Sequence, residues 1–158
     1  MRRITACLTL TAAILCTLVQ GPLRAGPEEP AALVRQAVAA ARAGNLGEAL
    51  TLAGRAVGLA PNDVNARMVR GRIYDLKTEY EKAIADYSAV IKQAPQFADA
   101  WQSRSEARFK TGKIRESLAD FDEFLKLAPD QKPYHWQRGI PLYYAGRYRE
   151  APRVVEGE

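Results

Sequence analysis

Histidine and cysteine are nearly absent from this chain of 158 residues. It has one histidine, His135, and two cysteines, Cys7 and Cys16, both within the first 25 residues. A single histidine excludes the histidine pairs of common zinc sites, and the two cysteines give the rest of the chain no disulfide framework. Nothing in the sequence marks a nucleophile or an orienting acid for His135. The sequence therefore predicts no catalytic site, no metal site and no enzymatic activity.

Phosphate-binding and calcium-binding motifs are missing as well. The glycines between residues 44 and 58 are scattered and do not form a phosphate-binding loop. Asp120 and Asp122 point to different faces of a predicted helix, and no loop has the ligand spacing of a calcium site. We therefore expect no bound cofactor and no small-molecule substrate.

Long apolar runs are absent except near the start of the chain. Two arginines precede an uncharged, mainly apolar run over 4–19, and Ala25 offers a cleavage point. This order is typical of an export signal, and the run is short for a membrane-spanning helix, which needs about 20 residues. The sequence predicts a signal peptide over 1–25, a linker over 26–30, and a location in the bacterial periplasm or outside the cell.

Two alternatives remain for this N-terminal segment, and both would tether the chain to a membrane. In the first, the segment stays uncleaved as an anchor. In the second, a cysteine carries a lipid, as in bacterial lipoproteins. The residue before Cys16 is the large Leu15, where lipoprotein signals have a small residue, and no apolar run precedes Cys7.

A strong excess of one charge is also absent. The chain has 23 basic and 18 acidic residues. Loss of 1–25 removes three arginines and leaves 23 − 3 = 20 basic residues against 18 acidic ones, a net charge of about +2. This balance gives no reason to expect nucleic acid binding. Most charged side chains on the predicted helices are expected to be solvated, and the functional alternative is an inner surface that prefers acidic segments. The charges concerned are Arg35, Arg42, Arg67, Arg70, Arg72, Arg104, Arg108 and Lys110 on the first helices, and Asp120, Asp122 and Glu123 on the last second helix.

Three Ala-Pro dipeptides recur along the chain at an even interval. Their prolines are Pro61, Pro95 and Pro129, and the two differences in position are equal, 95 − 61 = 34 and 129 − 95 = 34. A fixed period of this size indicates a repeat array. Small and apolar residues recur with the same period, at the spacing of a buried helix stripe. The recurring columns include Ala37, Gly71 and Ser105; Ala49, Ala83 and Ser117; Ala53, Tyr87 and Phe121; and Val57, Ile91 and Leu125.

Each repeat divides into two helices at a breaker that falls at Gly44, Thr78 or Gly112. Glycine suits the C-terminal cap of a helix. The Ala-Pro dipeptide ends the second helix, because proline cannot continue the hydrogen-bond ladder and disfavours helical geometry in the residue before it. The predicted first helices span 31–43, 64–77 and 98–111, and the predicted second helices span 46–59, 80–93 and 114–127.

This pattern resembles the tetratricopeptide repeat, a helix–turn–helix unit of about 34 residues. The resemblance implies an all-α, right-handed superhelical array of helical hairpins, with units over 31–63, 64–97 and 98–131. The first unit is degenerate, with Leu33 in the tryptophan column, and the third has Arg108 in the tyrosine column. The residues that carry the resemblance are Gly71, Tyr74, Ala83, Tyr87 and Pro95 in the second unit, and Trp101, Ser117, Phe121 and Pro129 in the third.

A partial fourth unit is expected over 132–158. Gly139, Gly146 and Ala151 fall in the appropriate columns, but Pro141 lies inside the expected first helix and Pro152 occupies an apolar column. A proline inside a helix costs about 3 kcal/mol or introduces a kink. The sequence shows no polar cap of the kind that usually ends a repeat array.

In the family that the chain resembles, first helices line a concave groove that binds protein partners. The clamp that grips terminal carboxylates in chaperone-tail binders is not matched here, because its columns hold Val34, Val38, Val69, Asp99 and Ser103. The predicted groove columns are Ala31, Val34, Val38 and Ala41; Asn65, Met68, Arg72 and Asp75; Asp99, Gln102, Glu106 and Phe109; and Trp136, Ile140 and Tyr143.

Aromatic residues gather at the C-terminal end of this predicted groove. Three of them could cradle an extended or helical peptide, with two cations steering its acidic groups, because aromatic anchors often dominate interface energy. The alternative is that these rings pack between the third and fourth units. The predicted partner-binding residues are Arg72, Gln102, Phe109, Lys110, Trp136 and Tyr143.

The sequence thus predicts a non-catalytic adaptor or scaffold that binds a protein or peptide partner on its concave face. The alternative is a self-assembling structural subunit of an envelope complex that stacks through its C-terminal end.

Overall fold

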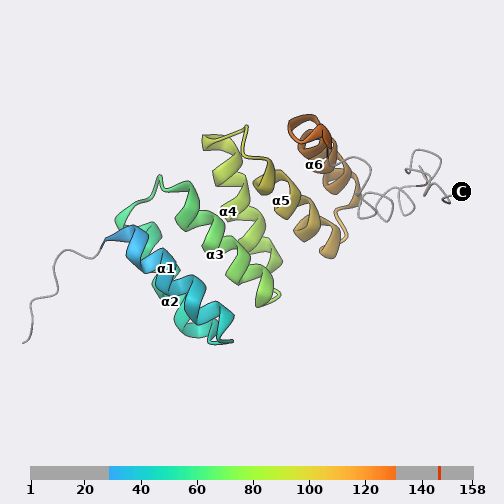
Figure 1. Ribbon diagram of the computed structural model, residues 1–158. Coiled ribbons are helices and arrows are strands. Elements are labelled where there is room, and N and C mark those ends of the chain that lie inside the picture. The colour runs from blue at the N-terminus through green and yellow to red at the C-terminus, as the bar shows by residue number, and fades with distance from the viewer. Residues whose placement is uncertain (1–28, 131–145, 147–158) are drawn as a thin grey trace, which may run out of the picture.

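Six α-helices make up the part of the chain that the computed structural model describes, residues 29–130 and Gly146. They form consecutive helical hairpins placed side by side (Figure 1), so the predicted all-α array is confirmed. Each helix bound lies within one residue of the predicted one. The helices are α1 Pro30–Arg42, α2 Leu46–Leu59, α3 Val64–Leu76, α4 Tyr80–Gln93, α5 Ala98–Lys110 and α6 Ile114–Leu127.

The predicted signal peptide and nearly all of the predicted fourth unit lie outside the described residues. Pro30, expected as the last linker residue, is already the first residue of α1. Proline suits this position because its fixed φ matches a helix and the first helical N–H needs no partner within the helix.

The turns inside the hairpins share one backbone conformation. Gly44, Thr78, Gly112 and Gly146 have φ values of 84°, 60°, 77° and 72°, and each stands one repeat period after the one before it. This left-handed region suits glycine, which has no Cβ. Thr78 is the exception in the described chain, and its β-branched side chain makes that turn strained.

The turns between hairpins are also alike. Ala60, Ala94 and Ala128 leave the helical region, with φ values of −133°, −134° and −129°, because each precedes a proline. In two of these turns a side chain six residues later caps the proline carbonyl. Arg67 Nε donates to the Pro61 oxygen at 2.8 Å, and Trp101 Nε1 donates to the Pro95 oxygen at 2.8 Å. Arg67 therefore replaces the tryptophan of this column in the second unit.

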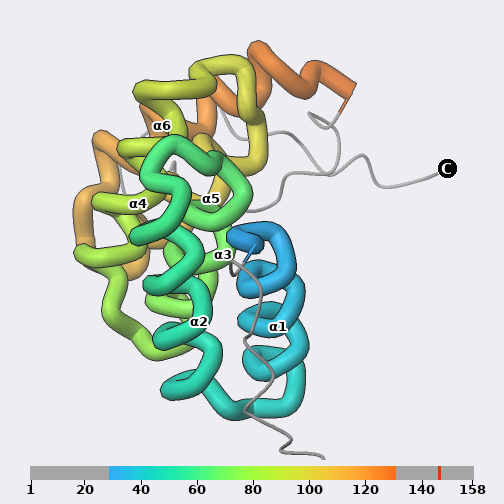
Figure 2. Tube along the Cα trace, turned by 90° about the vertical axis from the view of Figure 1, so that its left-hand side faces the viewer, coloured from blue at the N-terminus to red at the C-terminus, as the bar shows by residue number. Residues whose placement is uncertain are grey.

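The first helices of the hairpins form one face of the array. Each first helix packs against its own second helix, and α1 contacts α3 while α3 contacts α5. Figure 2 shows the hairpin of α1 and α2 lying alongside the following helices. We call the surface formed by α1, α3 and α5 the first-helix face. It is the counterpart of the predicted groove.

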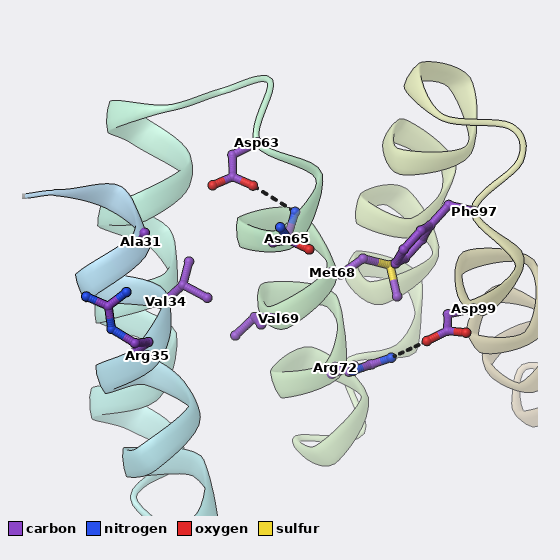
Figure 3. A pocket seen from close by; sticks show the side chains of 10 residues that line it. All are labelled: Ala31, Val34, Arg35, Asp63, Asn65, Met68, Val69, Arg72, Phe97 and Asp99. Atoms are coloured by element: carbon purple, nitrogen blue, oxygen red, sulfur yellow. Dashed lines mark hydrogen bonds and ion pairs between the residues drawn. The ribbon is translucent and has the colours of Figure 1, made fainter.

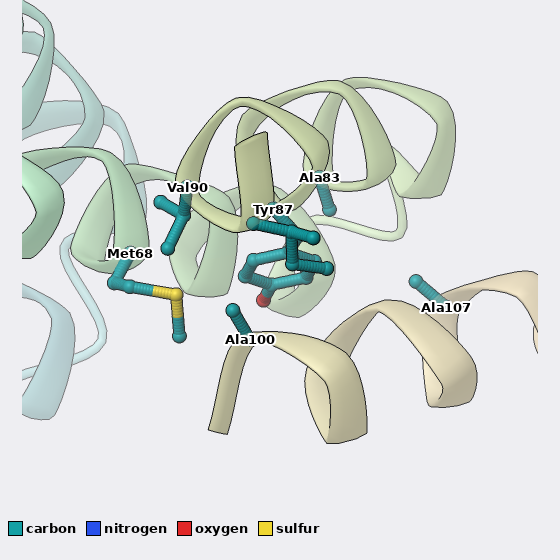
Figure 4. Packing of buried hydrophobic residues seen from close by; sticks show 7 residues of the cluster. Met68, Ala83, Tyr87, Val90, Ala100 and Ala107 are labelled. Carbon is teal, nitrogen blue, oxygen red and sulfur yellow. The ribbon is translucent and has the colours of Figure 1, made fainter. Parts of the chain in front are cut away.

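Close packing inside the second hairpin depends on the pair Gly71 and Tyr87. Tyr87 is fully buried, and Figure 4 shows it near Met68 of α3 and Ala100 of α5. A Cβ atom on Gly71 would lie 2.6 Å from Tyr87 Cε1, closer than real Cβ contacts. The residue in the small-residue column therefore has to be glycine in this unit, because the Tyr87 ring occupies the space that a Cβ would need.

Two ion pairs lie in the interior of the hairpins, one in the second unit and one in the third. Arg70 Nη2 lies 2.6 Å from Asp86 Oδ1, and Arg104 Nη2 lies 2.6 Å from Asp120 Oδ1. Asp120 also receives a hydrogen bond from Arg108 Nη1 at 2.7 Å. Asp120, which is 2% exposed, and the arginines that it and Asp86 hold are exceptions to the expectation that most charges on the helices are solvated.

Candidate functional site

A pocket of about 390 Å³ opens on the first-helix face, across all three of its helices. Figure 3 shows its lining side chains. They come from α1, α3, the start of α5 and the turns that precede α3 and α5. The lining residues are Ala31, Val34, Arg35, Asp63, Asn65, Met68, Val69, Arg72, Phe97 and Asp99.

The apolar part of the pocket lies between neighbouring first helices. Val34 of α1 and Val69 of α3 point toward one another across the gap between these helices (Figure 3). Both are half-buried and rest on the buried clusters of the first hairpin. On the other side of α3, Met68 extends toward Phe97. The pocket therefore offers aliphatic surface whose position is fixed by packing against these buried clusters.

The polar part of the pocket is largely satisfied by the protein itself. Asp63 caps α3, because its Oδ1 accepts hydrogen bonds from Asn65 N at 2.8 Å and Ala66 N at 3.3 Å. Arg72 Nη2 lies 3.3 Å from Asp99 Oδ2, which joins α3 to α5. These three charged groups already have partners inside the fold.

A second ion pair joins α3 to α5 on the same face. Lys110 Nζ lies 2.7 Å from Asp75 Oδ1, and 5.0 Å from the centre of the Tyr80 ring. Beside it, Lys113 Nζ reaches Glu81 at 2.8 Å. The second and third units are thus linked by ion pairs at both ends of α5.

The structure separates the predicted partner-binding residues. Arg72 lines the pocket. Gln102 donates through Nε2 to Glu106 Oε1 at 3.3 Å, and Phe109 is half-buried farther along α5. Lys110 is held by Asp75. Trp136 and Tyr143 lie outside the described residues, so the aromatic cradle stays a prediction.

The groove columns of the first three units were the more useful sequence signal. Ala31, Val34, Asn65, Met68, Arg72 and Asp99 all belong to the predicted columns and all line the pocket. The residues that column analysis missed include Arg35, Asp63 and Phe97. Asp63 and Phe97 share a column just before the first helix, because their positions differ by one repeat period, 97 − 63 = 34. That shared place in the repeat was the available signal.

Metal-ligating side chains do not cluster in the part of the chain that the structure describes. Within residues 29–130, no three side chains of histidine, cysteine, aspartate or glutamate converge on a common point. Burial raises the pKa of the Tyr87 hydroxyl far above its ordinary value, and the nearby Asp75 carboxylate adds to the shift. This tyrosine belongs to the core.

In the same described range, each helix is too short or too polar to cross a bilayer.

Known proteins with similar sequences are repeat proteins. The family model described as tetratricopeptide repeat matches residues 23–64, 34–98 and 68–132. The human protein described as mitochondrial import receptor subunit TOM70 is 28% identical over 79 residues, which are 50% of this chain and 13% of that protein. This chain therefore spans only a small part of that relative.

Solved structures with the same fold include two of MamA. The structure described as MamA 41-end from Desulfovibrio magneticus RS-1 superposes with a TM-score of 0.72 and 22% identity, covering 78% of this chain and 70% of that one. A crystal structure of MamA gives a TM-score of 0.75 and 18% identity, covering 82% and 75%. At this identity the likeness establishes a shared fold.

Proposed function

Because the chain belongs to the tetratricopeptide repeat family, we propose that it binds a peptide segment of a partner protein on its first-helix face. The family is one of protein–protein interaction modules, and this chain has its hairpin array. The chain would then act as a non-catalytic adaptor or scaffold.

The observation that carries the proposal is the position of the pocket. Its lining residues come from three successive first helices or the turns that precede them. Ligand sites combine apolar walls with a few polar groups that fix orientation, and this pocket has Val34 and Val69 beside Asn65 and Arg35. An extended peptide crossing the face would contact all three units.

The test is partner capture by the immobilised full-length chain with and without a blocked pocket. Asn65 is exposed and lines the pocket, so Asn65→Trp fills it without disturbing the core. We expect Asn65→Trp to lose the proteins that the wild type retains from an envelope extract. Ala85→Trp, on the exposed side of α4, is the matched control and should retain them. Equal capture by the two variants would remove the pocket from the proposal.

We also propose that the chain acts after export. The support is the order of a basic start, an apolar run and a small residue in the first 25 residues. Expression in a bacterium with an intact secretion system should release a chain that begins at Gly26, as measured by intact mass. A mature chain that keeps its first residues would favour the anchored alternative.

A further inference from the structure

One charged group that lines the pocket has no protein partner among the described residues. Four charged residues line it, and three of them are engaged: Asp63 caps α3, and Arg72 pairs with Asp99. Arg35 forms no ion pair or hydrogen bond with any residue in the described range, and its side chain is exposed. A free guanidinium at the edge of a pocket is a binding group for a carboxylate.

Arg35 lies next to the aliphatic part of the pocket. It follows Val34 in α1, and Val34 faces Val69 across the gap between α1 and α3 (Figure 3). A ligand that reaches Arg35 therefore passes over half-buried aliphatic surface, whose further burial favours binding. The two features together describe a ligand with an aliphatic group beside an acidic one.

The other end of the first-helix face lacks this combination. There the cations Arg72 and Lys110 are paired with Asp99 and Asp75. At the junction of the first two units, the equivalent positions lie one repeat period earlier and carry no charge. They hold Val38, Asn65, Leu76 and Ala41. The junction between α1 and α3 thus has no ion pair at these positions.

We propose that the pocket selects partner segments in which an aliphatic residue lies beside an aspartate or glutamate. The aliphatic side chain packs between Val34 and Val69, and the carboxylate pairs with Arg35. This inference rests on the proposed function and names the chemistry of the partner. It also moves the steering charge from the predicted Arg72 and Lys110 to Arg35.

The probe is a random peptide library displayed on phage and selected on the full-length chain. We expect enriched peptides to carry an aliphatic residue next to an acidic one. Affinity of a synthetic enriched peptide is then measured by fluorescence anisotropy. Arg35→Glu should weaken it by about tenfold or more, the scale of one ion pair in a partly desolvated site. A peptide with lysine in place of its acid should bind Arg35→Glu better than it binds the wild type.

Arg42 supplies the matched control, because it is exposed on the same helix and does not line the pocket. Arg42→Glu makes the same change in net charge and should alter affinity by less than about twofold. Equal losses in the two variants would show general electrostatic attraction and overturn the inference. Enrichment of peptides without acidic residues would overturn it as well.

Asn65→Trp separates this inference from the proposed function. If the enriched peptides lack acids but still lose binding in Asn65→Trp, the pocket binds peptides and only the chemistry proposed for them is wrong. If Asn65→Trp binds like the wild type, or if the library yields no binder, both proposals fail.

Discussion

At the scale of single residues, one glycine is constrained by its neighbour while others are not. An added Cβ on Gly71 would meet the Tyr87 ring at 2.6 Å, whereas one on Gly54 would meet nothing within 4 Å. Both glycines lie inside helices. Replacing glycine by alanine should therefore change the free energy of unfolding in opposite directions at the two positions.

We expect Gly71→Ala to lower the free energy of unfolding by about 1–2 kcal/mol, since overpacking costs more than the gain in helix propensity. Gly54→Ala should raise it by about 1 kcal/mol, because alanine restricts the unfolded chain and clashes with nothing. Urea denaturation of the full-length variants, followed by circular dichroism, measures both. A destabilised Gly54→Ala would show that the outer side of α2 is covered.

The Tyr87 hydroxyl is buried without a hydrogen-bond partner among the described residues. An unpaired buried hydroxyl is unfavourable, so Tyr87→Phe should leave stability at neutral pH unchanged or raise it by about 1 kcal/mol. The same urea denaturation measures this change.

The raised pKa of Tyr87 also predicts a pH dependence. In the unfolded chain a tyrosine loses its proton near pH 10, while folded Tyr87 keeps it. Above this pH the unfolded state binds fewer protons, so stability falls as pH rises, by about 1.4 kcal/mol per pH unit. Tyr87→Phe lacks this contribution. Unfolding curves of both proteins between about pH 9 and pH 11 should therefore diverge, and parallel curves would contradict the burial of this hydroxyl.

At the scale of helices, the interior carboxylates hold the two members of a hairpin together. Asp86 of α4 and Asp120 of α6 occupy the same column, and each receives a bidentate arginine from the first helix of its hairpin. In the first unit this column holds Leu52 and the arginine column holds Gln36. The first hairpin therefore relies on apolar packing where the other two use charge.

Removing one of these carboxylates should lower the free energy of unfolding, because its arginines stay in the interior without a counter-charge. Asp120→Ala leaves Arg104 and Arg108 without their partner, and their side chains are only 12% and 21% exposed. Breaking a buried pair on one side costs about 3–5 kcal/mol, and the partial exposure here reduces the expectation to about 2–3 kcal/mol. Glu116→Ala, an exposed acid on the same helix, should change the free energy of unfolding by less than about 0.5 kcal/mol. Urea denaturation compares the two variants, and similar losses in both would place Asp120 among ordinary surface charges.

The helices were predictable because their signals are local. Proline, glycine and the repeat columns mark each boundary in the chain itself, and the bounds followed to within one residue. The interior ion pairs were not predictable in the same way. Arg70 and Asp86 look like ordinary surface charges on helices, and only the packing of α3 on α4 brings them together.

In the candidate site too, some features could be predicted from the sequence and others depend on packing between units. Column positions correctly placed Val34, Met68 and Asp99 on one face. They could not show that Arg72 and Lys110 have acidic partners, because Asp99 and Asp75 lie 27 and 35 residues away and meet them only across a unit boundary. Which cation remains free is a property of the assembled array.

At the scale of the whole molecule, the units differ in the size of the side chains that they bury. The core of the first hairpin includes the small side chains of Ala37, Ala40, Ala49 and Ala53, while the second and third hairpins bury Tyr87 and Phe121. Buried apolar area sets much of the stability of a unit, and repeat arrays open locally in proportion to it. The first hairpin should therefore open more readily than the second.

Hydrogen exchange of the full-length chain measures this difference. We expect amides in the middle of α1 and α2 to exchange faster than amides in the middle of α4 and α5. Tyr87→Ala, which empties the second core, should reduce or reverse the order. Uniform protection along the array would instead indicate that the units open as one body.

The two ion pairs between α3 and α5 also have a mechanical consequence. The curvature of a repeat array is the sum of small rotations between successive units. Arg72–Asp99 and Lys110–Asp75 hold α5 near its two ends, so rotation between the second and third units is resisted at two separated points. The equivalent positions between α1 and α3 carry no such charges. We therefore expect a segment bound between Val34 and Val69 to change the rotation between the first two units, and with it the curvature of the array.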